Sequence, residues 1–264
     1  MAQTIRVITY NIRYDSPKDG ENKWELRKDN LCDQLKFYEP DVFGIQEGLL
    51  HQVNYINNAL KGYEFVGVGR DDGKKEGEFS AIFYKTNKLK VIKQGTFWLS
   101  KTPKEVSVGW DASMERICTY AHFKDLELGD EFWVFNTHFD HIGALAREKS
   151  AALILEQIKS FNKNNLPVIL MGDFNLMPES KPIELVLNSM NDTKLTATQV
   201  SFGPDGTYNG FDFDKAITRR IDYIFTSKNN IKVLKYATIS DSKDFKYYSD
   251  HLPVLAEIEL NTGQ

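Results

Sequence analysis

The sequence has only two cysteines, Cys32 and Cys118, and they lie far apart outside any CxxC pattern. It therefore predicts neither a cysteine zinc site nor a redox motif, and we expect both thiols to be small buried side chains. No apolar run reaches the length of about 18 residues that a membrane-spanning helix needs. No charged segment followed by an apolar stretch is present at the N-terminus, so no signal peptide is predicted and a cytoplasmic protein is the default expectation.

An excess of positive charge is also missing. The formal net charge is −4 and the pI is about 5.8. Proteins that bind duplex nucleic acid without sequence preference usually neutralise phosphates with a basic face. The mild lysine clusters of this chain are typical of a solvated strand face. The charge balance argues against a tight duplex binder, leaves small or single-stranded substrates open, and indicates no protein partner.

Hydrophobic residues make up 41% of the chain and charged residues 27%, as in an ordinary globular protein. The apolar periodicity predicts helices at 24–38, 52–60 and 144–161, with a short one within 178–188. Strands are predicted at 5–14, 42–46, 63–69, 81–84, 89–98, 116–123, 132–137, 168–171, 221–225, 233–239 and 252–260. Strands alternate with helices early and pair with strands later, which favours a mixed α/β layered fold. No linker divides the chain, so residues 1–264 are interpreted as a single domain, with a long loop at 201–218.

Acidic, amide and histidine residues lie at or near the ends of the predicted strands, where a rigid scaffold presents chemistry. The candidates are Asn11, Glu47, Glu78, Arg116, Asn136, His138, Asp140, Asp173, Asn175, Asp222, Asp250 and His251. Each has a structural alternative when taken alone; the Gly-Asp-Phe-Asn segment at 172–175, for example, is rich in turn formers. Their joint occurrence is what points to a reactive site.

Two kinds of chemistry are represented in this set. A hard divalent cation prefers carboxylate and amide oxygens, which Glu47, Asn11 and Asp250 supply. A water molecule that attacks phosphorus needs a group to orient and deprotonate it, a role that suits Asp173 and His251. Several further groups complete this hypothesis: Asn175 as an orienting amide, Asp222 as the partner of His251, and His138, His251 and Arg116 facing the negative charge of the transition state.

At these residues the sequence resembles the endonuclease/exonuclease/phosphatase superfamily. The resemblance runs from Asn11 to His251 in the family's order and is most specific at Gly-Asp-Phe-Asn and at Ser-Asp-His, residues 249–251. It implies an α/β four-layer sandwich in which two packed mixed β-sheets are flanked by helices. It also implies Mg²⁺ or Mn²⁺ held chiefly by Glu47, with Asn11 and Asp250 nearby.

The resemblance also implies residue roles. Asp173 orients or deprotonates the attacking water beside Asn175, and His251 contacts the scissile phosphate. Asp222 then supports a histidine, and His138 binds phosphate or protonates the leaving group. The remaining candidates are expected to bind substrate or its phosphate: Arg116, Asn136, Asp140 and Glu78, with Glu78 also the expected partner of His138.

Three functions are compatible with these expectations. The leading hypothesis is a divalent-metal-dependent phosphodiesterase of the nuclease type, in its finer form a 3′-to-5′ exonuclease whose loop aromatics stack on bases: Phe202, Tyr208, Phe211 and Phe213. The alternative is a phosphoesterase for a small molecule or lipid headgroup. The acidic pI favours it, as does Gly48-Leu49-Leu50, where some duplex-cutting members carry a basic residue. A catalytically dead binding scaffold is disfavoured because Glu47, Asp173, Asp250 and His251 are all present.

Overall fold

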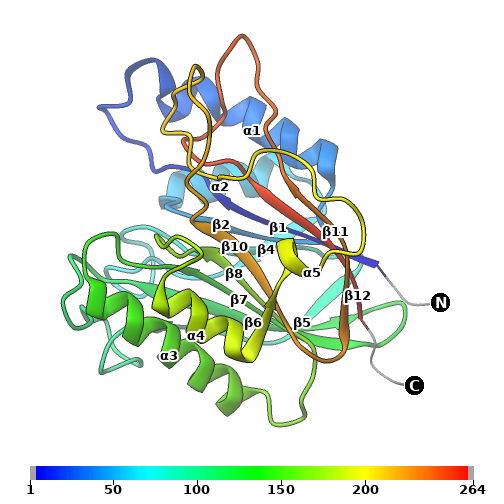
Figure 1. Cartoon of the computed structure of the whole chain (residues 1–264). Helices are drawn as coiled ribbons and strands as arrows, with labels where there is room; N and C mark the ends of the chain where they lie inside the picture. Colours follow the sequence, from blue (N-terminus) through cyan, green and yellow to red (C-terminus); the bar gives the residue numbers. More distant parts are fainter. Residues whose placement is uncertain (1–3, 261–264) are drawn as a thin grey trace.

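The computed structural model describes residues 4–260 and contains two six-stranded mixed sheets packed face to face (Figure 1). The first sheet has the order β11-β12-β1-β2-β4-β3, with strands Ile231–Thr238, Val254–Leu260, Thr4–Asn11, Val42–Gln46, Ile82–Lys85 and Tyr63–Val66. The second has the order β5-β6-β7-β8-β10-β9, with strands Leu89–Trp98, Ile117–Asp125, Glu131–His138, Val168–Asp173, Asp222–Ser227 and Met190–Asp192. The buried apolar side chains between the sheets form the central core.

Helices cover the outer face of each sheet and complete the four layers (Figure 1). Helices α1 (Trp24–Tyr38) and α2 (Leu50–Ala59) pack their apolar residues on the first sheet. Helices α3 (Ala144–Phe161) and α4 (Lys181–Ser189) do the same on the second. The predicted α/β four-layer sandwich is therefore confirmed. No helix within residues 4–260 is long and apolar enough to cross a membrane.

The predicted boundaries differ from the observed ones mainly where the chain leaves a regular element. The first strand ends at Asn11 rather than at residue 14, because Arg13 adopts a left-handed backbone conformation with φ 55°. Three short elements are absent from the predicted set: the 3₁₀ turn Gly20–Asn22, strand β9 and helix α5 (Thr193–Thr196). Elements this short carry too few residues for a periodic pattern.

Strand register brings the candidate residues to one edge of the sandwich. β1 runs parallel to β2, which pairs Asn11 with Gln46 next to Glu47. β7 runs parallel to β8 and pairs His138 with Asp173. β10 runs antiparallel to β8 and pairs Asp222 with the same Asp173. Since the strand ends coincide, residues far apart in the sequence meet at this edge.

Candidate active site

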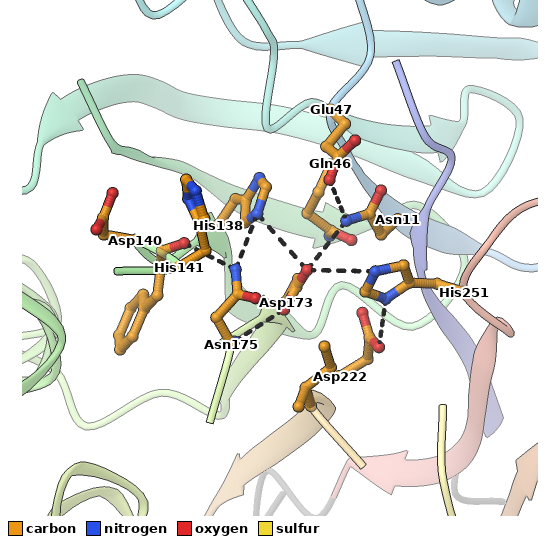
Figure 2. Close-up of polar contacts among 12 residues, drawn as sticks. Asn11, Gln46, Glu47, His138, Asp140, His141, Asp173, Asn175, Asp222 and His251 are labelled. Atoms are coloured by element: carbon orange, nitrogen blue, oxygen red, sulfur yellow. Dashed lines mark hydrogen bonds and ion pairs between the residues drawn. The ribbon is translucent and has the colours of Figure 1, made fainter. Parts of the chain in front are cut away.

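Asp173 lies at the centre of the cluster at this edge (Figure 2). Its Oδ2 accepts a hydrogen bond of 3.0 Å from Asn11 Nδ2. The same oxygen lies 3.5 Å from His138 Nε2 and 3.8 Å from His251 Nε2. Its Oδ1 accepts a 2.8 Å hydrogen bond from the backbone N–H of Asn175. One oxygen of the carboxylate is thus fixed by a backbone N–H, and the other lies near three side-chain nitrogen atoms.

The protonation of Asp173 is set by its surroundings. The side chain is fully buried, and desolvation, with a further contribution from the negative charge of Asp222, raises its pKa to about 7. His251 opposes this shift. A carboxyl group with a pKa near neutrality can accept a proton from water and release it again at physiological pH.

His251 and Asp222 form a buried pair on one side of Asp173. His251 Nδ1 lies 2.8 Å from Asp222 Oδ2, which leaves Nε2 facing Asp173 (Figure 2). Burial alone would lower the pKa of His251, but the carboxylates of Asp222 and Asp173 raise it well above its ordinary value. His251 is therefore held as a cation, in a fixed orientation.

His138 lies on the other side of Asp173 and has the opposite electrostatics. Burial and the positive charges of Arg116 and Arg70 hold the pKa of His138 well below its ordinary value. Its Nε2 lies 3.2 Å from Asn175 Nδ2 and its Nδ1 lies 3.8 Å from Glu78 Oε2. With Nε2 accepting from the amide, the proton of the neutral ring is on Nδ1 and faces Glu78.

A cavity of about 460 Å³ opens above this cluster. It is lined by Arg13, Tyr14, Glu47, Arg70, Glu78, Met114, Arg116, His138, His141, Asp173, Asn175, Tyr208, Arg219, Ile221, Asp250 and His251. Most of the predicted site residues are in this set. Asn11 and Asp222 lie just behind it, each hydrogen-bonded to a residue of the lining.

Three arginines that were not predicted as site residues, at positions 13, 70 and 219, line the same cavity. They lie in loops, and nothing in the surrounding sequence distinguishes them from solvated arginines. Arg70 binds Glu78 through two hydrogen bonds of 2.6 and 3.0 Å, so Glu78 is shared between this arginine and His138. The left-handed backbone at Arg13, at the end of β1, turns its side chain toward Glu47 and Asp250.

The sequence profile of the Endonuclease/Exonuclease/phosphatase family matches residues 8–251. The chain belongs to the endonuclease/exonuclease/phosphatase family. Enzymes of this family are phosphoesterases that use divalent metals, and the chain is accordingly a metal-dependent phosphoric ester hydrolase.

The chain is similar to several proteins of known structure or known sequence. A family protein from Bacteroides thetaiotaomicron is 36% identical with a TM-score of 0.97, covering 100% of this chain and 98% of its own. A mannosyl-6-phosphatase from the same organism is 38% identical with a TM-score of 0.93, covering 96% and 99%. The exoribonuclease subunit Ccr4 of Saccharomyces cerevisiae is 22% identical over 99% of this chain, which spans 40% of that protein's length.

The donor set near Asp173 fits a divalent cation of the kind that the family uses. Asn11 Nδ2 donates a 2.9 Å hydrogen bond to Glu47 Oε1, and Arg13 Nη1 lies 4.0 Å from Glu47 Oε2 and 3.9 Å from Asp250 Oδ2. Burial raises the pKa of Asp250, so an added positive charge there would be favourable. Two carboxylates and an amide are hard ligands, and we propose that Glu47, Asp250 and Asn11 hold Mg²⁺ or Mn²⁺.

Replacing Glu47 by glutamine is expected to raise the Mg²⁺ concentration for half-maximal activity by about tenfold or more, because one anionic ligand is lost. The measurement is a metal titration of activity, together with calorimetric titration of the metal alone. Glu76→Gln, an exposed acidic residue in a nearby loop, is the matched control. An unchanged titration would remove Glu47 from the ligand set.

Asp140 lies outside the cavity, although the sequence analysis assigned it to substrate binding. It is 1% exposed and accepts hydrogen bonds from the backbone of Ile142 and Gly143, from Ser113 and from Arg116. Burial alone would raise its pKa, but these hydrogen bonds and the charge of Arg116 bring it below the ordinary value. The structure therefore places Asp140 behind Arg116, as a residue that positions that guanidinium.

Replacing Asp140 by asparagine is expected to lower the free energy of unfolding at pH 7 by roughly 1.5–3 kcal/mol, the usual range for hydrogen bonds to a charged group. Because the folded-state pKa is lowered, this stabilisation is present above the unfolded-state pKa of about 4 and is lost as the pH falls through the folded-state value. Urea unfolding of both proteins at neutral and acid pH measures the difference. A loss that grows toward acid pH would contradict this assignment.

Asn136, which was also predicted to bind substrate, is not among the residues that line the cavity. Its side chain is fully buried between the sheets, where Nδ2 donates to the backbone oxygens of Ile45 and Ala81 at 2.9 Å and Oδ1 accepts from Gln46. Gly44 leaves room for it, since a Cβ there would lie 2.6 Å from the Asn136 amide. The amide thus joins the two sheets.

Replacing Asn136 by alanine is expected to destabilise the fold by about 1–3 kcal/mol, because buried hydrogen-bonding groups lose their partner. We expect the folded protein to keep a nearly normal kcat even though its free energy of unfolding is lowered. Urea unfolding monitored by tryptophan fluorescence measures the first quantity, and assays well below the melting temperature measure the second. A large fall in kcat with normal stability would restore Asn136 to the active site.

Proposed function

We propose that the chain hydrolyses the phosphate monoester of a small hydrophilic molecule, such as a sugar phosphate, by direct attack of water. The observation that carries this proposal is the size and charge of the cavity. Its volume of about 460 Å³ falls in the usual range for small-molecule sites, roughly 300–1,000 Å³. Its lining holds four arginines and four carboxylates, so a bound divalent cation gives it a net positive charge. This suits a phosphate monoester, which carries about −1.5 to −2 charges at neutral pH, more than a diester.

The residues of the cluster have complementary roles in this reaction. Asp173 accepts the proton of the attacking water, and Asn175 fixes the orientation of that carboxylate through its backbone N–H. Cationic His251, held by Asp222, faces the phosphate oxygens as negative charge develops. Arg116 lines the cavity with its buried Nη1 free of any protein partner among the described residues, which leaves a donor for a phosphate oxygen.

The metal, when bound, supplies positive charge that stabilises the phosphate in the transition state. His138 is neutral, so it adds no charge to the site; donating to the phosphate or the leaving oxygen would require its ring proton on Nε2 instead of Nδ1. The arrangement contains no serine or cysteine nucleophile in the cavity lining, and this supports water as the attacking group.

The walls of the cavity support a small polar leaving group. Among the four loop aromatics predicted to stack on bases, only Tyr208 lines the cavity. Phe202 is 79% exposed beside β11, and Phe213 packs on Phe245 and Tyr247. Binding of a single strand normally uses successive stacking platforms. The aliphatic side chains of the lining are Met114 and Ile221 alone, too few to hold a lipid tail.

One relative supports the monoesterase, and another supports a nuclease as the second candidate. The solved structure of 38% identity is described as a mannosyl-6-phosphatase, which acts on a sugar phosphate. The second candidate is a nuclease acting on single strands. It is favoured by the alignment with Ccr4, described as a 3′-5′-exoribonuclease subunit, over nearly the whole chain at 22% identity.

A comparison of two substrates separates the two candidate functions. The protein with Mg²⁺ is given hexose 6-phosphates in one reaction and a 5′-labelled single-stranded RNA or DNA in another, with Asp173→Asn as the contamination control. Release of inorganic phosphate with an intact oligonucleotide is the expected result. A ladder shortening from the 3′ end without sugar phosphate hydrolysis, absent in the control, would replace the proposal with the exonuclease.

A further inference from the structure

Arg219 differs from the other arginines of the cavity in its partners. Arg13 pairs with Asp19, Arg70 with Glu78 and Arg116 with Asp140. Within residues 4–260, the Arg219 guanidinium has neither a carboxylate partner nor a hydrogen bond to the protein; its contact is the ring of Tyr208, 4.8 Å from the guanidinium carbon to the ring centre. Among the four arginines that line the cavity, Arg219 is therefore the one whose charge no carboxylate of the described residues neutralises.

The backbone of Arg219 is rigidly placed beside the catalytic cluster. Its carbonyl accepts hydrogen bonds from the N–H groups of Thr207 and Tyr208, at 2.8 and 3.0 Å. The hydroxyl of Thr207 in turn accepts from the N–H of Asp222 at 3.1 Å. Gly206 permits this close pairing, since a Cβ there would lie 2.6 Å from the backbone nitrogen of Arg219. The segment that presents Arg219 is thus tied to the strand that presents Asp222.

Tyr208 sets the direction of the free guanidinium. The Tyr208 ring meets the His251 ring edge to face, with 5.1 Å between centres, and Arg219 stacks on Tyr208. Tyr208 therefore contacts both residues, with His251 facing Asp173 and Arg219 exposed at the cavity rim. Because all three residues line the same cavity, a substrate whose phosphate lies beside His251 can reach Arg219 with its remainder.

The chemistry of the guanidinium indicates what it binds there. An arginine stacked on an aromatic face keeps its N–H edges free, and these edges form paired hydrogen bonds with planar or tetrahedral oxyanions. We propose that Arg219 is a specificity residue that binds a second anionic group on the leaving-group side of the substrate. The inference rests on the proposed function and narrows it to phosphate esters that carry a second phosphate or a carboxylate.

Binding measured without turnover tests this proposal. The Asp173→Asn protein, with Mg²⁺, is titrated calorimetrically with glucose 6-phosphate, glucose 1,6-bisphosphate and 6-phosphogluconate. We expect at least one of the two doubly anionic ligands to bind about tenfold or more tightly than glucose 6-phosphate, the usual scale of a charge-assisted hydrogen-bond pair. The ligand that shows this preference tells whether the second anion is a phosphate or a carboxylate.

The preference is expected to disappear when Arg219→Gln is added and to survive Lys215→Gln. Lys215 is the matched control because it is a cation of the same loop that pairs with Asp212 and lies outside the cavity lining. Equal affinity for all three ligands, a preference that survives Arg219→Gln, or equal weakening of all three in that variant would each overturn the proposal.

Turnover gives a second measurement that does not depend on the Asp173 variant. The ratio of kcat/KM for glucose 1,6-bisphosphate or 6-phosphogluconate to that for glucose 6-phosphate is expected to fall by about tenfold in Arg219→Gln. Hydrolysis of all three esters at equal kcat/KM in the wild type would overturn the role of Arg219 while leaving the monoesterase proposal intact. A ligand preference in calorimetry without any phosphate release would instead reject the monoesterase and keep the anion site.

Discussion

Replacing Asp173 by asparagine is expected to lower kcat by a factor on the order of 10²–10⁴, because the group that takes the proton from water is lost. Asparagine has nearly the same shape, so the contact with Asn11 Nδ2 is altered while the cavity is kept. Substrate binding is expected to change much less than turnover. The measurement is steady-state kinetics of phosphate release with saturating Mg²⁺.

Folding is the control for this variant. Asp173 is fully buried beside the negative charge of Asp222, and that environment disfavours its ionised form. Removing the charge is therefore expected to leave the melting temperature unchanged or to raise it. A near-normal kcat would reject Asp173 as the proton acceptor, whereas a lost kcat with an unfolded protein would show a structural effect only.

Replacing Asp222 by asparagine is the variant with the second-largest expected effect, a loss of kcat by about 10²–10³. Asp222 accepts the hydrogen bond of His251 Nδ1 at 2.8 Å and is the leading contribution that raises the pKa of this histidine against burial. Without the carboxylate, the ring loses both its fixed orientation and its preference for the charged form, as in other carboxylate–histidine pairs.

The pH dependence of kcat in this variant distinguishes loss of the His251 charge from a merely structural defect. Since Asp222 raises the pKa of His251, its removal lowers that pKa, and the cationic ring is then lost at a lower pH. The alkaline limb of kcat is expected to move to lower pH when activity is measured from about pH 5 to 9. A uniform loss at every pH would contradict the role of Asp222 in holding His251 charged.

Much of the fold could be predicted from the sequence because its long elements carry clear periodicity. Helices 24–38 and 144–161 were predicted with the boundaries that the structure shows. Members of the catalytic cluster could be predicted because they lie at the ends of strands, in short motifs such as Gly-Asp-Phe-Asn. Parallel strand register then brings those motifs together, which is a property of the topology rather than of any one segment.

Asn136 and Asp140 lie outside the cavity lining for reasons that a linear sequence pattern does not contain. Asn136 and His138 point to the same face of β7, but Asn136 pairs with Met171, two positions deeper than the pair of His138 and Asp173. How far a residue lies from the edge of the two packed sheets depends on how the opposite sheet covers its strand. The sequence of the strand itself does not specify that. Asp140 lies two residues past the end of β7, where its carboxylate accepts hydrogen bonds from the backbone that leads into α3.

The arginines could not be predicted for a related reason. Arg13 and Arg219 reach the cavity through loop conformations, a left-handed residue in one case and a tightly paired segment in the other. Loop geometry of this kind depends on contacts with distant residues, such as those of Gly206 with the backbone of Arg219. Their place in the cavity is a consequence of tertiary structure.

The measurement that tests the central claim most directly is the rate of inorganic phosphate release from hexose phosphates by one protein preparation in three conditions. These are saturating Mg²⁺, excess EDTA, and EDTA followed by an excess of Mg²⁺, with Asp173→Asn run in parallel. We expect release in the first condition, none above background in the second, recovery in the third, and almost none from the variant. Equal rates with and without EDTA, or equal rates in the wild type and the variant, would contradict a metal-dependent phosphomonoesterase centred on Asp173.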